Sequence, residues 1–92
     1  MKLTYDPNKD AANITKHGLS LADALLVFDA PDKLTLKSPK GDEARLVDIA
    51  MVAVAGVVLA LIYVIREPDE VRAISLRRAS KQERTLYAKN YH

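Results

Sequence analysis

The seventeen residues between Asp48 and Arg66 carry no formal charge, and their conformation constrains the whole fold. Eight of them are Val or Ile, whose branched side chains pack well on a pleated sheet and lose rotamer freedom in a helix. As one helix they would span roughly 25 Å, which is short of a ~30 Å hydrocarbon core. Gly56 lies near their middle, where a hairpin would turn. We therefore expect two neighbouring strands, about 44–54 and 57–66, with a single-pass membrane helix as the less favoured alternative.

Capping and turn residues divide the rest of the chain into short elements. Asp6 and Gly18 have the positions of a helix N-cap and C-cap, Ser20 begins a second helix, and Ser80 with Glu83 forms a capping box. These signals predict an α+β domain of order β-α-α-β-β-β-β-α with an antiparallel meander sheet. In chain order, we expect a strand at 1–5, helices at 6–18 and 20–30, strands at 34–37, 44–54, 57–66 and 71–78, and a helix at 79–92.

Length and composition limit the classes of protein that fit. Ninety-two residues are enough for a single domain, 1–92, with a core that a partner subunit would strengthen. The absence of cysteine excludes disulfides and thiolate metal sites and is compatible with a reducing cytosol, and no apolar signal segment opens the chain. Positions 72–92 carry six Lys or Arg against one acidic residue, whereas 1–71 carry eight against eleven. This basic end suits a polyanion, an acidic partner or an anionic lipid surface, or it is an ordinary solvated helix face.

Several motifs spread along the chain occur together in one known family. The segment YDPNKDAANITKHGLSLADALLVF resembles the opening of the BrnT toxins, W-D-x-x-K-x-x-x-N-x-x-K-H-G-[VI]-S-F-x-x-A followed by V-F. GDEAR resembles the family's G-E-x-R turn, and YVIR its Y-T-x-R strand end. VRAISLRRASKQERTLY resembles R-I-I-S-A-R-x-A-x-x-E-R-x-x-Y, so the resemblance covers nearly the whole chain. The matching positions of the first segment are Asp6, Lys9, Asn13, Lys16, His17, Gly18, Ser20, Ala24, Val27 and Phe28.

The resemblance implies a ribonuclease toxin of a type II toxin–antitoxin pair with a RelE-like fold. It further implies neutralisation by a BrnA-type antitoxin, a toxin homodimer within the neutralised complex, and contact with operator DNA only through the antitoxin. With no membrane involved, we expect the protein to act on RNA in the cytoplasm.

Cutting RNA without a metal requires a base, a cation that stabilises the phosphorane, and an acid. Arg66 and Arg77 are the first candidates for phosphate contacts, because each ends an apolar strand and the guanidinium fork fits phosphate oxygens. His17 is a candidate acid or base, with Lys16 beside it, although both could simply stabilise the end of a helix. Two histidines far apart and no carboxylate cluster predict no bound metal, and we expect no cofactor.

A second set of candidates has stronger structural alternatives. Glu43 and Arg45 would project from one strand face as a base and cation, or as a surface ion pair. Tyr63 and Tyr87 could stack on bases, although a tyrosine inside so apolar a strand is more often buried, and Arg78 could contact RNA beside Arg77. Strand alternation predicts one face holding Ala73, Ser75 and Arg77 and the other holding Arg72, Ile74 and Leu76.

Two classes besides the ribonuclease remain open at this point. One is a catalytically degenerate module that binds its antitoxin and contributes to operator binding. The other is the membrane peptide, whose segment from Arg66 onward would be cytosolic by the positive-inside rule.

Overall fold

A computed structural model describes residues 1–38, 44–52 and 56–90 of the chain. Within these ranges the fold is α+β, as expected, with a five-stranded sheet and three α-helices. The helix expected at 20–30 is instead a 3-10 turn followed by a short α-helix. The elements are β1 (Lys2–Thr4), α1 (Pro7–His17), the 3-10 turn η1 (Leu21–Asp23), α2 (Leu25–Phe28), β2 (Leu34–Lys37), β3 (Leu46–Val52), β4 (Val57–Arg66), β5 (Glu70–Arg78) and α3 (Lys81–Asn90).

The described residues of the uncharged segment belong mainly to the neighbouring strands β3 and β4, which pair antiparallel from Leu46 opposite Tyr63 to Val52 opposite Val57. Gly56 lies between them with φ of 65°, a conformation that glycine adopts without a Cβ penalty, and its N–H bonds to the Val52 carbonyl at 2.7 Å. The predicted hairpin is therefore confirmed. No helix in the described part of the chain is long and apolar enough to cross a membrane.

The sheet is mixed, so the prediction of a purely antiparallel meander was wrong at one edge. Strand order is β1-β5-β4-β3-β2, and β2 to β5 do form an antiparallel meander. β1 pairs parallel with β5, with Leu3 opposite Val71. No hairpin links these two strands, because most of the chain lies between them, and the sequence pattern therefore did not set their relative direction.

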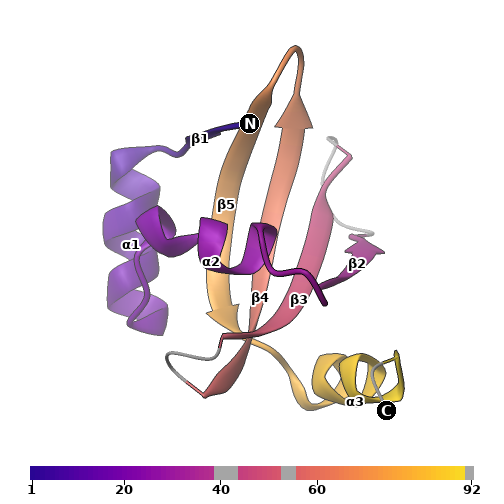
Figure 1. The fold of residues 1–92 in the computed structure, drawn as a ribbon. Helices are drawn as coiled ribbons and strands as arrows, with labels where there is room; N and C mark the ends of the chain where they lie inside the picture. The colour runs from indigo at the N-terminus through magenta and orange to yellow at the C-terminus, as the bar shows by residue number, and fades with distance from the viewer. Residues whose placement is uncertain (39–43, 53–55, 91–92) are drawn as a thin grey trace.

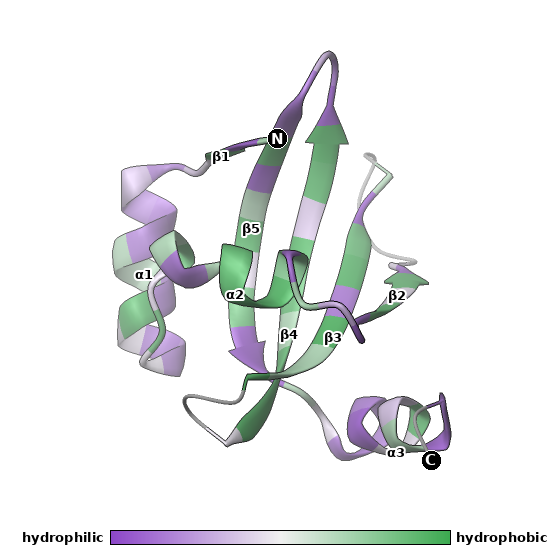
Figure 2. Cartoon of the chain, viewed as in Figure 1, coloured by the Kyte–Doolittle hydropathy of each residue, from purple (hydrophilic) through white to green (hydrophobic). Residues whose placement is uncertain are grey.

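Helices cover the two faces of the sheet unequally. Figure 1 shows α2 crossing in front of β5, β4 and β3, with α1 lying along β5. Leu21, Val27 and Leu61 are fully buried between η1, α2 and the sheet. On the other face Tyr87 of α3 packs with Ile49 in a smaller cluster. In Figure 2 the central strands are mostly hydrophobic, whereas α1 and α3 are mostly hydrophilic, which is typical of helices that pack one side against a sheet.

One carboxylate is buried inside the apolar sheet. The Asp48 side chain has no exposed surface and accepts hydrogen bonds from Lys33 Nζ at 2.7 Å, Thr35 Oγ1 at 2.6 Å and the Tyr63 hydroxyl at 2.9 Å. The Lys33 ammonium also lies 4.0 Å from the centre of the Phe28 ring. A buried charge is tolerated only when it is paired and hydrogen-bonded, so this network joins β2, β3, β4 and α2 at one point.

Candidate functional site

A groove of about 760 Å³ lies on the sheet face that α3 covers only in part. Four of the described residues along it are cationic, and they come from α1, β2, the segment before β3, and β5. Apolar residues of the four strands β2, β3, β4 and β5 form its floor, and the first turns of α3 form one wall. Its lining residues are Lys16, Leu36, Lys37, Ser38, Arg45, Val47, Ile62, Ile74, Ser75, Arg77, Gln82, Glu83 and Leu86.

An irregularity in β5 decides which side chains reach this groove. Opposite β4, Ile62 pairs with Ser75 and Tyr63 pairs with Ala73, so Ile74 is an extra residue in β5. Such an insertion breaks the alternation of faces, and Ala73 and Leu76 both lie in the core under the helices. Ser75 and Arg77 share a face as predicted, but Ile74 lines the groove with them and Ala73 does not, so the predicted grouping was wrong for Ala73 and Ile74.

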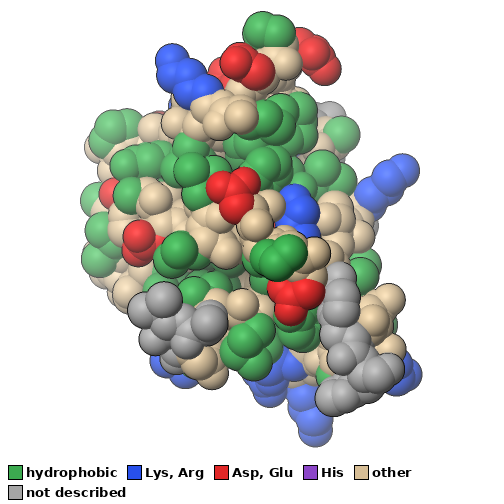
Figure 3. All heavy atoms as spheres, viewed as in Figure 1, with side chains coloured by type: hydrophobic (Ala, Val, Ile, Leu, Met, Phe, Trp, Pro, Cys, Tyr) green, Lys and Arg blue, Asp and Glu red, His purple; other side chains and the backbone are tan. Residues whose placement is uncertain are grey.

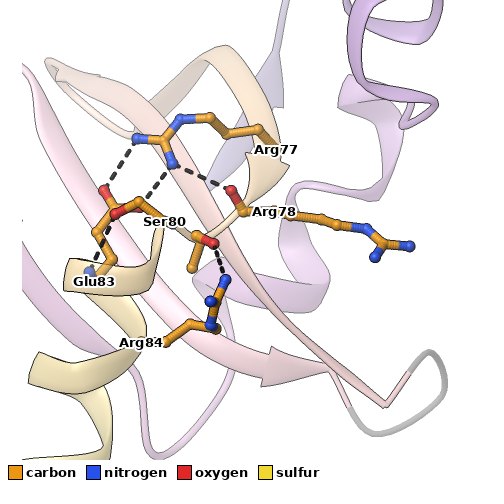
Figure 4. Close-up of polar contacts among 6 residues, drawn as sticks. Arg77, Arg78, Ser80, Glu83 and Arg84 are labelled. Carbon is orange, nitrogen blue, oxygen red and sulfur yellow. Dashed lines mark hydrogen bonds and ion pairs between the residues drawn. The ribbon is translucent and has the colours of Figure 1, made fainter.

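Arg77 is held by a two-pronged ion pair with Glu83. Its Nη1 lies 2.7 Å from Oε1 and its Nη2 lies 3.0 Å from Oε2, and Nη1 also donates to the Arg78 carbonyl at 3.3 Å (Figure 4). The hydrogen bond to Glu83 raises the pKa of Arg77. The same bond is the main reason that the pKa of Glu83 lies below its usual value, so both groups stay charged near neutral pH.

Glu83 takes its position from the start of α3. The Ser80 N–H donates to Glu83 Oε1 at 2.8 Å, and the Glu83 N–H donates to Ser80 Oγ at 3.1 Å, which confirms the predicted capping box. The sequence analysis assigned Glu83 this capping role alone and missed its place in the groove. The spacing of six residues from Arg77 around a strand-to-helix turn is the signal that could have indicated the pair.

Arg45 presents an unpaired donor at the groove. Its Nε atom is buried and has no hydrogen-bond partner within the described ranges. Burying an unsatisfied polar group costs about 1–3 kcal/mol, so a site of this kind favours a ligand that supplies an acceptor. Together with Lys16, Lys37 and Arg77, Arg45 makes the groove a favourable place for an anion.

Asn13 fixes α1 against β5 and thereby places Lys16 at the groove. β1 pairs with β5 only as far as Arg72. Beyond Arg72 the outer edge of β5 therefore has no strand partner among the described residues. Asn13 Nδ2 donates to the carbonyls of Leu76 at 2.8 Å and Leu19 at 2.7 Å. Its Oδ1 accepts from the Leu76 N–H at 3.1 Å and from a serine hydroxyl of β5. The side-chain amide therefore does what a neighbouring strand would do at Leu76.

His17 lies in a smaller hollow that continues from the groove. Lys16 lines both hollows, and Lys9 lines the smaller one beside His17. Gly18 ends α1 with φ of 72°, so His17 occupies the last helical position, as predicted. Lys9 was not among the predicted site residues, although it matches the family motif. Within the described ranges no three His, Asp or Glu side chains gather as metal ligands would.

Three predicted site residues lie elsewhere or outside the described ranges. Arg77 lies opposite Ala60, whereas Arg66 is six residues further along β4, or about 20 Å away at 3.3 Å per residue, so the two arginines do not meet. Arg78 is exposed and points away from the Arg77–Glu83 pair in Figure 4. Glu43 lies outside the described residues.

The structure removes both tyrosines from the predicted RNA-binding set. Tyr63 is 2% exposed, donates to Asp48 and meets Phe28 edge to face with ring centres 5.4 Å apart. Tyr87 is 8% exposed, donates to Asp32 at 2.7 Å and accepts from the Met51 N–H at 3.3 Å. Neither ring has a free face on which a base could stack. Both tyrosines are buried, which the sequence analysis gave as the alternative for Tyr63.

Comparison with known proteins identifies the family of this chain. A family profile described as "Ribonuclease toxin, BrnT, of type II toxin-antitoxin system" matches residues 5–83. The chain belongs to the BrnT family. A search of curated proteins finds no match. The crystal structure of the Brucella abortus ribonuclease toxin BrnT is similar, with a TM-score of 0.69 and 28% sequence identity over 88% of this chain and 99% of that chain.

Membership of the BrnT family gives the protein its class. It is a ribonuclease toxin of a type II toxin–antitoxin system, which implies an antitoxin partner. The family resemblance that the motifs indicated is thereby confirmed.

Proposed function

We propose that this BrnT-family chain is an endoribonuclease that cleaves RNA in the groove of Lys16, Arg45 and Arg77 without a metal ion. The observation that carries the proposal is the convergence on one groove of cations from separate elements, among them Arg45, whose buried Nε has no hydrogen-bond partner among the described residues. An RNA phosphate supplies both the negative charge and the acceptor atoms that such a groove requires. Among the described lining residues, Glu83 is the one carboxylate, and its ion pair with Arg77 leaves the positive charges of Lys16, Lys37 and Arg45 in excess.

In this proposal the 2′-hydroxyl of one nucleotide loses its proton and its oxygen attacks the adjacent phosphorus. The bond to the 5′-oxygen of the next nucleotide breaks, and that oxygen takes up a proton, which leaves a 2′,3′-cyclic phosphate and a 5′-hydroxyl. Arg45, Arg77 and Lys16 stabilise the charge that develops on the phosphorane. His17 serves as acid or base from the adjoining hollow, and Glu43 remains the second candidate for a base. Because Arg77 keeps the pKa of Glu83 low, Glu83 is a poor proton donor near neutral pH.

The proposed setting follows from the family. We expect a BrnA-type antitoxin to neutralise this toxin, a toxin homodimer within the complex, and operator DNA binding only through the antitoxin. We likewise expect action in the cytoplasm, where the RNA is, a single domain over 1–92, and a fold of the RelE-like kind.

Incubating the purified chain with a defined RNA in excess EDTA tests the proposal. Cleavage with 2′,3′-cyclic phosphate ends and no stimulation by added Mg²⁺ supports it. Cleavage only with a divalent ion overturns the metal-independent mechanism. RNA left intact under both conditions would favour the degenerate binding module, which requires no catalytic groove.

A further inference from the structure

A second hollow, of about 940 Å³, lies beside α2 and is lined mostly by apolar side chains. Leu26 and Met51 both line this hollow and are 51% and 45% exposed, and an exposed apolar patch with a polar rim is typical of an interaction site. Figure 3 shows hydrophobic side chains gathered on this face of the molecule, with carboxylates among them. Its lining residues are Ala22, Asp23, Leu25, Leu26, Asp29, Ala30, Pro31, Asp32, Met51 and Val52.

The charge at this hollow is opposite to that of the RNA groove. Asp23, Asp29 and Asp32 are the charged residues among the described side chains that line it. Asp32 accepts the Tyr87 hydroxyl, whereas the carboxylates of Asp23 and Asp29 are exposed to solvent. An RNA strand would be repelled here. A polypeptide with an apolar anchor flanked by Lys or Arg would be complementary to the hollow.

We infer that this hollow docks a basic, apolar-anchored segment of the antitoxin, an inference that rests on the proposed function. Leu26 and Met51 form the apolar centre, and Asp23 and Asp29 pair with the cations of the segment. No described residue that lines this docking surface also lines the RNA groove, so antitoxin binding is anchored by side chains that RNA cleavage does not use.

A second copy of the chain fits the hollow less well. The C-terminal helix α3 carries Lys81, Arg84 and Lys89 and is therefore the basic element that a second copy could offer. Leu86 of the same helix lines the RNA groove. A copy docked through α3 would therefore crowd its own catalytic groove, which is not expected of an active free toxin.

The inference is tested with the purified chain and the protein product of the adjacent antitoxin gene, separated from their complex in denaturant and refolded. Leu26→Ser alters the apolar centre of the docking surface, and Asp29→Lys alters its charged rim. Each variant should therefore bind the antitoxin about tenfold or more weakly than the wild type, as measured by calorimetry. Asp69→Lys, which makes the same charge change in the β4–β5 turn, is the matched control and should change the affinity by less than about twofold. Both variants binding like the wild type would overturn the inference.

Two further readouts keep the outcomes separate. If light scattering shows that Asp29→Lys dissociates a toxin dimer while antitoxin affinity is unchanged, the hollow holds a second copy and the inference fails. RNA cleavage by the free variants should equal that of the wild type, since neither residue lines the RNA groove. A wild-type chain that cleaves no RNA would refute the ribonuclease proposal and leave the binding result standing.

Discussion

The Tyr63 hydroxyl donates a 2.9 Å hydrogen bond to the Asp48 carboxylate diagonally across the β3–β4 pair. Tyr63 lies opposite Leu46 and Asp48 lies opposite Leu61, so the phenol reaches one diagonal neighbour on the same face. Burial, and secondarily the hydrogen bond to Asp48, raise the pKa of Tyr63, which keeps the phenol neutral and donating. A tyrosine that the sequence offered as a base-stacking residue therefore helps to hold a charged group inside the sheet.

Removing the Asp48 carboxylate should destabilise the fold much more than removing the Tyr63 hydroxyl. Asp48→Ala removes the acceptor that Lys33, Thr35 and Tyr63 share, whereas Tyr63→Phe removes one hydrogen bond from a carboxylate that keeps two others. We expect the free energy of unfolding to fall by about 2–4 kcal/mol in Asp48→Ala and by about 1 kcal/mol in Tyr63→Phe. Urea denaturation of both variants measures this, and equal losses would contradict the role given to Asp48.

The Arg77–Glu83 pair should make stability depend on pH in acid. Because the pKa of folded Glu83 is lowered from the usual 4.5, its contribution is fully present above that value and is lost as the pH falls through the folded pKa. The stability gap between the wild type and Glu83→Gln should therefore be wide at pH 7 and shrink below about pH 4. Chemical denaturation across this range measures the gap, and a gap of constant size would show that the pair does not titrate as described.

Asn13 should be needed to fasten α1 to β5. Asn13→Ala leaves the Leu76 N–H and carbonyl without their partner in a buried position, which we expect to cost about 2–3 kcal/mol. Hydrogen exchange of the Leu76 amide should accelerate more than exchange at the centre of β4. Asn8→Ala on the exposed side of α1 is the control, and the idea fails if the two variants exchange alike at Leu76.

Local signals in the sequence predicted most of the secondary structure. The caps Asp6, Gly18 and Ser80 and the turn residue Gly56 act through neighbouring backbone groups, so their effect is readable from spacing alone. The parallel pairing of β1 with β5 depends on packing between residues about 68 positions apart, which no local pattern encodes.

The site was harder to predict, because it depends on one extra residue and on contacts between distant elements. The additional Ile74 in β5 moves Arg77 to the face opposite Ala73 and Leu76. The antiparallel pairing of β4 with β5 places Arg66 near the other end of the strand pair from Arg77. Strand ends, residue spacing and the family motifs indicated Lys16, Arg45 and Arg77, but they could not show that Glu83 binds Arg77 or that Tyr63 and Tyr87 are buried.

The cleavage rate of Arg45→Gln compared with that of Arg66→Gln tests the central claim most directly. Arg45 is the cleaner probe of the groove, since Arg77 also holds the start of α3 through Glu83. At saturating concentrations of the chain, in EDTA, a defined RNA should be cut about 100-fold or more slowly by Arg45→Gln. Arg66→Gln, which removes a cation outside the groove, should stay within about threefold of the wild type. Equal loss in the two variants, or an Arg45→Gln variant as active as the wild type, would contradict the assignment of this groove as the catalytic site.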